Sequence, residues 1–298
     1  MDIPLPFSKL ALDLIDHDDK TNVVLVATAS FNPPTFMHLC LLLARDALNS
    51  EGLCVIGGYM SPVYDAYNKR GLISSEHPIK LGQLACKSSD FMIVDPWEVI
   101  YTLSLHFKLE TIFLKFLDVT SFFLQEKNFS ALLTVLSRVK SFLCEWIVVI
   151  VCGYDVLQSF AIPGFWIPEQ DTTYYEASSF FLVQTICSEF GVVCICREGQ
   201  DVEKIVSDDE VLNKNRLTRC LNRFLHYKIV DELVPNQISS TRVRDCISKG
   251  LSIKYLTADE VVNYITENQL YFNEKLWQTP ILNQYINKIY FMLLLLII

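Results

Sequence analysis

Residues 22–38 read NVVLVATASFNPPTFMH and carry the clearest structural signal in the chain. Its first part, Asn22–Ala27, is a continuous apolar and β-branched run, typical of a strand buried on both faces of a parallel sheet. A proline-rich loop follows, and Thr35–Leu48 then reads as a helix with Pro34 suited to its first turn. The stretch predicts the opening strand–loop–helix unit of an α/β domain.

The same alternation continues along the chain. Further strands are predicted at residues 53–57, 91–94, 146–152, 191–196 and 228–230. Further helices are predicted at residues 76–87 and 183–190, from Ser239-Ser240 onward, and at 258–268 with Thr257 as N-cap. Alternating strands and helices indicate the α/β class: a doubly wound, Rossmann-like parallel sheet with helices on both faces.

Composition excludes several classes of protein. Lys and Arg number 25 against 34 Asp and Glu, a net charge of −9 over 298 residues, which argues against nucleic acid as a partner. Hydrophobic residues make up 51% and charged residues 20%, so the chain is not disordered. The apolar run 291–298 is far shorter than the roughly 20 residues that span a bilayer. We expect a soluble protein of the cytoplasm or nucleus, without a stable membrane anchor.

The ten cysteines show no spacing typical of a zinc site, so we expect buried, reduced thiols and no metal site built from the chain's own side chains. The loop after the first strand is more informative. Ligands of doubly wound sheets bind at the carboxyl ends of the strands, and a helix N-terminus there attracts phosphate. His38, on the first turn of the predicted helix, could donate to that phosphate; a capping or surface histidine is the alternative.

Residues 29–38 resemble the nucleotidyltransferase signature G-x-F-x-P-x-[HT]-x-x-H, with Thr35 and His38 in the last two specified positions. More narrowly, the chain resembles the plant-type eukaryotic nicotinamide/nicotinic acid mononucleotide adenylyltransferases. Further blocks carry this resemblance in the same order: IGGYMSPVYDAYNKRGLIS (56–74), VDPWE (94–98), TVLSRVKSFLCE (134–145), CGYDVLQSFAIPGFWIPEQ (152–170) and VPNQISSTRVR (234–244).

The resemblance implies an enzyme that transfers the adenylyl group of ATP to nicotinamide or nicotinic acid mononucleotide. The products are NAD or deamido-NAD and pyrophosphate, a step of NAD biosynthesis. The mononucleotide phosphate attacks the α-phosphorus directly, so positioning and charge stabilisation carry the catalysis. The implied cofactor is Mg²⁺, held mainly by the ATP phosphates. The oligomeric state stays open between a monomer and a homo-oligomer.

The resemblance also assigns site residues. The catalytic set is His38, Lys69 and Arg244. The ATP-binding set is Ala29, Ser30, Phe31, His38, Asn236, Ser239, Ser240, Thr241 and Arg244. The mononucleotide-binding set is Ser30, Lys69, Gly153, Asp155, Phe165, Trp166 and Arg197. For three of these a structural role is the alternative: a solvated loop cation for Lys69, a helix N-cap for Asp155 and a core aromatic for Trp166.

Two departures from the family pattern concern the site itself. Ala29 stands where the family has glycine, at a position where we expect close phosphate approach and a positive φ. Tyr154 replaces a small residue, and we expect its phenol to crowd the ribose pocket. The alternative function is therefore an inactive or impaired member of the same fold that binds nucleotide without turnover.

The remaining departures concern domain organisation. We expect a nucleotidyltransferase domain over residues 1–271, with atypical insertions at 99–130, 171–182 and 217–227, followed by an atypical apolar C-terminal tail at 272–298. These stretches lack periodicity and begin and end abruptly at the edges of the matched blocks. We interpret them as translated introns or an aberrant splice form.

Overall fold

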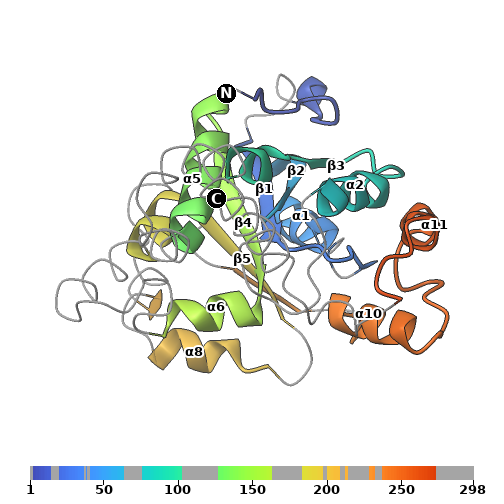
Figure 1. Ribbon diagram of the computed structural model, residues 1–298. Coiled ribbons are helices and arrows are strands. Elements are labelled where there is room, and N and C mark those ends of the chain that lie inside the picture. Colours follow the sequence, from blue (N-terminus) through green and yellow to red (C-terminus); the bar gives the residue numbers. More distant parts are fainter. Residues whose placement is uncertain are drawn as a thin grey trace, which may run out of the picture.

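A parallel sheet of six strands forms the centre of the protein (Figure 1). The computed structural model describes residues 3–14, 20–36, 38, 41–63, 76–102, 127–162, 183–196, 200–208, 212–213, 228–231 and 237–272. The strands lie in the order β3 (Met92–Val94), β2 (Cys54–Pro62), β1 (Asn22–Ala29), β4 (Ile147–Gly153), β5 (Gly191–Cys196) and β6 (Lys228–Asp231). This order reverses between β1 and β4, as in Rossmann-like sheets.

The opening strand is buried on both faces, as its apolar run predicts. Val23 and Leu25 pack into one core cluster, whereas Val24 and Val26 pack into another on the opposite face. Because side chains alternate along a strand, each face of the sheet needs its own layer of helices. β1 runs two residues beyond the predicted end, to Ala29, and pairs with β2 along its whole length.

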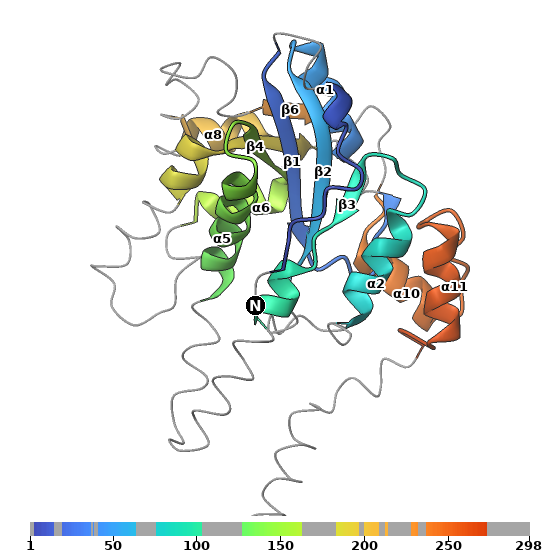
Figure 2. The ribbon, with the colours of Figure 1, turned by 90° about the horizontal axis from the view of Figure 1, so that it is seen from above.

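Helices cover both faces of the sheet (Figure 2). One side carries α1 (Leu41–Ser50) and α2 (Glu76–Ala85). The other carries α5 (Lys127–Phe142), α6 (Tyr154–Phe160) and α8 (Val202–Asp208). A short 3₁₀ helix, η1 (Leu12–Leu14), precedes β1, and residues 97–102 and 183–189 are also helical. This arrangement confirms the predicted doubly wound α/β fold.

A C-terminal segment, residues 237–272, packs beside α2 at one end of the sheet (Figures 1 and 2). It contains α10 (Ser240–Ser248) and α11 (Asp259–Glu267). Its apolar residues form a third core cluster with α2; the buried members include Leu81, Ala85, Val243, Ile247, Val261, Ile265, Leu270 and Tyr271. This packing brings the start of α10 next to the loop that follows β1.

Several predicted details are wrong. The helix predicted from Thr35 begins at Leu41, and His38 lies before it in a 3₁₀-like turn. The N-cap of α11 is Ala258, and the hydroxyl of Thr257 donates elsewhere. Ala29 is an ordinary strand residue, whereas Phe31 has the positive φ of 43°. The described cysteines are all free, but Cys144 is exposed rather than buried.

Most of the atypical stretches fall outside the described residues. Only residues 99–102 and 127–130 of the first predicted insertion, and Phe272 of the predicted tail, are described. The insertions, the tail and the domain over residues 1–271 stay predictions. Within the described part of the chain, the structure has no helix that is both long and apolar enough to traverse a bilayer.

Candidate active site

A cavity of about 320 Å³ opens at the carboxyl ends of β1, β4 and β5. It lies where the strand order reverses, the place where doubly wound sheets bind ligands. Its walls come from four parts of the chain: Ala27, Thr28, Ala29, Phe31, Thr35, His38 and Leu41; Val151, Cys152, Gly153, Asp155 and Val156; Ile195; and Ile238, Ser239, Ser240 and Thr241. The volume falls in the range usual for small-molecule sites.

His38 is held in one orientation by the turn that precedes α1. Its Nδ1 lies 2.8 Å from the backbone nitrogen of Thr35 and 3.1 Å from Thr35 Oγ1. Because a backbone N–H can only donate, Nδ1 is the acceptor, and the neutral imidazole carries its proton on Nε2. The ring meets Phe31 edge-on, with centroids 5.0 Å apart. His38 therefore presents a fixed donor at the cavity.

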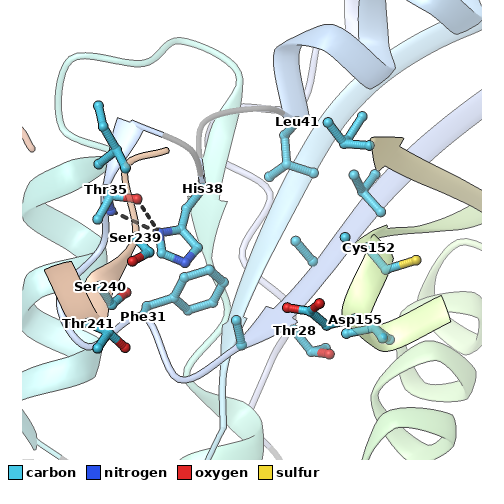
Figure 3. A pocket seen from close by; sticks show the side chains of 17 residues that line it. Thr28, Phe31, Thr35, His38, Leu41, Cys152, Asp155, Ser239, Ser240 and Thr241 are labelled. Atoms are coloured by element: carbon cyan, nitrogen blue, oxygen red, sulfur yellow. Dashed lines mark hydrogen bonds between the residues drawn. The ribbon is translucent and has the colours of Figure 1, made fainter. Parts of the chain in front are cut away.

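The opposite wall of the cavity comes from the end of β4 (Figure 3). Gly153 is the N-cap of α6, with extended backbone, and a Cβ built on it meets no atom within 4 Å. Asp155 lies in the first turn of α6 and lines the cavity, so it is not the N-cap. Tyr154 packs against the hydrophobic core and is absent from the described cavity lining; crowding of the ribose pocket stays a prediction.

The start of α10 forms the wall beside His38 (Figure 3). Ser239 is the N-cap, and its hydroxyl accepts from the backbone N–H of Arg242 at 3.2 Å. The hydroxyl of Ser240 donates to the carbonyl oxygen of Pro33 at 2.8 Å. These serines open the helix as predicted, and they bring its N-terminus to the same cavity as His38.

Arg244 lies one turn into α10 and contacts the loop after β1. Its Nη1 donates to the carbonyl oxygen of Asn32 at 2.6 Å, and its Nη2 to Thr241 Oγ1 at 3.3 Å. Arg244 therefore contacts the cavity wall through Thr241, which lines the cavity, and is not itself part of the described lining. In this structure the guanidinium holds the loop in place.

The structure gathers eight predicted site residues around the cavity: Ala29, Phe31, His38, Gly153, Asp155, Ser239, Ser240 and Thr241. Ser30 and Arg244 are described but do not belong to its lining. Five lie outside the described residues: Lys69, Phe165, Trp166, Arg197 and Asn236. The assigned roles stay predictions for all of them.

Sequence reasoning missed part of the lining, namely Ala27, Thr28, Leu41, Val151, Cys152, Val156, Ile195 and Ile238. One signal could have found some of them. Parallel strands end at a common edge, so the last residues of each predicted strand should meet there. Cys152, for example, pairs with Cys194 on β5 close to that edge.

A second polar cluster lies at the carboxyl ends of β2 and β3. Asp95 is fully buried and forms an ion pair with Arg138 at 2.5 Å. Glu98 is 3% exposed and accepts from the hydroxyl of Ser61 at 3.4 Å. Burial raises the pKa of Glu98 to about 8, the Ser61 hydrogen bond opposes that shift and the nearby Asp95 adds to it. The Glu98 carboxyl is therefore mostly protonated at neutral pH.

The donor set of the cavity bears on metal binding. Among the described lining residues, Asp155 is the single acidic side chain, accompanied by the hydroxyls of Thr28, Thr35 and the α10 N-terminus. No group of three His, Cys, Asp or Glu side chains within the described ranges is placed to hold a metal ion. Such a set fits Mg²⁺ that is carried mainly by substrate phosphates and water.

Comparison with known proteins identifies the family of the chain. The cytidylyltransferase-like family model matches residues 26–246. A nicotinamide/nicotinic acid mononucleotide adenylyltransferase of Arabidopsis thaliana is 49% identical over 280 residues, covering 91% of this chain and 98% of the relative. The enzyme of that name from rice is 46% identical over 281 residues, covering 91% and 95%. Adenylyltransferase 1 of Bos taurus is 33% identical over 288 residues, covering 87% and 92%.

The family-model match spans the loop after β1, the end of β4 and most of α10, and the three relatives align with 87–91% of this chain. They confirm the resemblance on which the site residues were chosen. The chain belongs to the family of nicotinamide/nicotinic acid mononucleotide adenylyltransferases.

Proposed function

We propose that the cavity at the ends of β1 and β4 is where this chain transfers the adenylyl group of ATP to nicotinamide or nicotinic acid mononucleotide. Family membership makes the chain a nucleotidyltransferase of NAD biosynthesis. The observation that carries the proposed site is the meeting of His38 and the N-terminus of α10 on one cavity. A phosphate there would face an imidazole N–H and helix N–H groups together.

The chain's residues act by positioning and by charge stabilisation. Because Thr35 fixes Nδ1 of His38 as an acceptor, the neutral imidazole carries its proton on Nε2, and this N–H donates to the phosphate when substrate binds. Negative charge grows on the α-phosphate oxygens as the mononucleotide phosphate attacks. His38 and the start of α10, Ser239–Thr241, stabilise that charge, and Arg244 holds the loop and assists at the β- and γ-phosphates.

The mononucleotide lies against the wall formed by the end of β4. The open space above Gly153 admits close approach of the ligand, and the Asp155 carboxylate accepts from its hydroxyl groups. The family resemblance adds Ser30, Lys69, Phe165, Trp166 and Arg197 to this side and Asn236 to the ATP side. Mg²⁺, bound through the ATP phosphates, offsets part of the triphosphate charge.

A direct assay tests the function. Purified chain is incubated with ATP, Mg²⁺ and nicotinamide mononucleotide, and NAD formation is followed; a parallel reaction with nicotinic acid mononucleotide reports deamido-NAD. We expect product with at least one of the two. Nucleotide binding without product would instead support the impaired alternative. Sedimentation of the same preparation gives the oligomeric state. The predicted compartment stays the cytoplasm or the nucleus.

A further inference from the structure

The C-terminal segment holds the loop after β1 by its backbone. Three consecutive carbonyl oxygens, those of Asn32, Pro33 and Pro34, each accept from a different side chain of residues 237–272. The donors are Arg244 at 2.6 Å, Ser240 at 2.8 Å and Thr257 at 2.7 Å. Buried carbonyls need partners, and Pro33 and Pro34 have no N–H groups of their own to donate within the loop. The loop's conformation therefore depends on donors from outside it.

A fourth contact fixes the side chain of Asn32 in the loop. The hydroxyl of Tyr271 donates to Asn32 Oδ1 at 2.5 Å, and the two residues are 3% and 1% exposed. Thr257 is equally buried, at 2% exposed. Both donors lie outside the described lining of the cavity. Because neither lines the described cavity, we expect both to act on the reaction through the loop that they contact.

The loop connects these donors to His38. Thr257 binds the carbonyl of Pro34, and the next residue, Thr35, supplies the N–H that orients the imidazole. Phe36 adds a backbone hydrogen bond to Leu256, next to Thr257. A shift of the loop would move Thr35 and with it Nε2 of His38. Displacements of about 1 Å at a reacting centre can lower rates by about a hundredfold.

We propose that Tyr271 and Thr257 are positioning residues for adenylyl transfer, which set the orientation of His38 through the loop at residues 32–35. The proposal rests on the proposed function. Its expected signature is a loss in kcat that exceeds any change in KM, because His38 acts on charge that develops in the transition state.

Three variants of the full chain test the proposal by steady-state kinetics. Tyr271→Phe and Thr257→Val each remove one donor at nearly constant volume, and we expect each to lower kcat by about tenfold with little change in KM for ATP. Thr257→Ser keeps the donor and should retain nearly full kcat. Unchanged kcat in both donor-deleted variants would overturn the proposal.

Tyr264→Phe is the matched control. Tyr264 lies in the same segment, on α11, and its hydroxyl contacts Nδ1 of His77 on α2 at 3.0 Å, away from the loop. We expect this variant to lose a comparable hydrogen bond without a change in kcat. If Tyr264→Phe lowers kcat as much as Tyr271→Phe, the effect is general to the segment and the proposal is wrong.

A measurement independent of turnover separates this proposal from the proposed function. In hydrogen–deuterium exchange of the ligand-free protein, Tyr271→Phe should speed exchange in a peptide spanning residues 30–38 and leave β2 unchanged. Equal exchange in the wild-type and variant loops would overturn the positioning role. Absence of product from the wild-type chain would instead overturn the proposed function, whatever the exchange result.

Discussion

Nδ1 of His38 accepts a hydrogen bond from the backbone N–H of Thr35 at 2.8 Å, so the orientation of the imidazole is fixed by main chain. This relationship leaves Nε2–H as the imidazole donor to a bound phosphate. We predict that His38→Ala lowers kcat by about 10²- to 10³-fold, the usual effect of deleting one preorganised donor, with a smaller change in KM for ATP.

Thr35→Ala is the matched control for this prediction. The variant loses the Oγ1 contact with Nδ1 but keeps the backbone N–H that orients the ring. Its kcat should stay within about fivefold of wild type, because a neutral side-chain hydrogen bond contributes about 1 kcal/mol or less here. A loss in Thr35→Ala as large as that in His38→Ala would show that the hydroxyl, rather than the imidazole, is the critical group.

Gly153 should be needed for ligand access and dispensable for folding. Its φ is −90°, which any residue adopts, and a Cβ there meets no protein atom within 4 Å. We predict that Gly153→Ala leaves the unfolding midpoint unchanged and raises KM for the mononucleotide by about tenfold, because the methyl group occupies ligand space. Thermal unfolding and initial-rate kinetics on the same preparation check both parts.

Gly57→Ala should show the opposite pattern. Gly57 lies in β2, and a Cβ on it would collide with the buried side chain of Leu10. We expect a loss of about 1–3 kcal/mol in the free energy of unfolding from overpacking, with KM unchanged for the folded fraction. Equal KM values for Gly153→Ala and wild type would remove Gly153 from the proposed ligand wall.

Ala29 allows a test of the glycine that the family has at this position. Ala29 lies in β1 without a positive φ and lines the cavity, so its methyl group adds volume but no backbone strain. We predict that Ala29→Gly raises kcat/KM for ATP, while glycine in a strand lowers the free energy of unfolding by about 0.5–1 kcal/mol. Ala29→Val, the reverse change in volume, should lower kcat/KM. An effect of the same sign in both variants would contradict a role for side-chain volume.

The fold was predictable because its signals are local. The apolar runs of β1, β4 and β5 appear in the sequence at nearly their observed bounds, and alternation with helices leads to a parallel sheet. The start of α1 was misplaced because residues 32–35 are held by contacts from residues more than 200 positions away, which no local pattern reveals. For the same reason Thr257 appeared to be a helix cap although it binds the loop.

The site was predictable in part. Ser239, Ser240 and Thr241 were placed correctly because a run of hydroxyl residues before a helical pattern marks a helix start. The contact of Arg244 with Asn32 was not predicted, since it depends on how α10 docks against the β1 loop. The buried pair of Asp95 and Arg138 and the nearby Glu98 were missed as well, because burial of charged residues follows from tertiary packing.

Glu98 predicts how stability depends on pH. Its pKa is raised by burial from 4.5 to about 8, so between these values the folded state binds a proton that the unfolded state releases. The contribution of Glu98 to the free energy of unfolding is therefore fully present below about pH 4.5 and is lost as pH rises toward 8, with a slope of up to about 1.4 kcal/mol per pH unit. Glu98→Gln, which mimics the protonated form, should flatten this slope. Urea unfolding at pH 5, 6, 7 and 8 measures the slope.

Glu189→Gln, at a side chain that is 56% exposed, is the control and should leave the slope as in wild type. Parallel slopes for wild type and Glu98→Gln would mean that Glu98 is ionised in the folded protein at neutral pH.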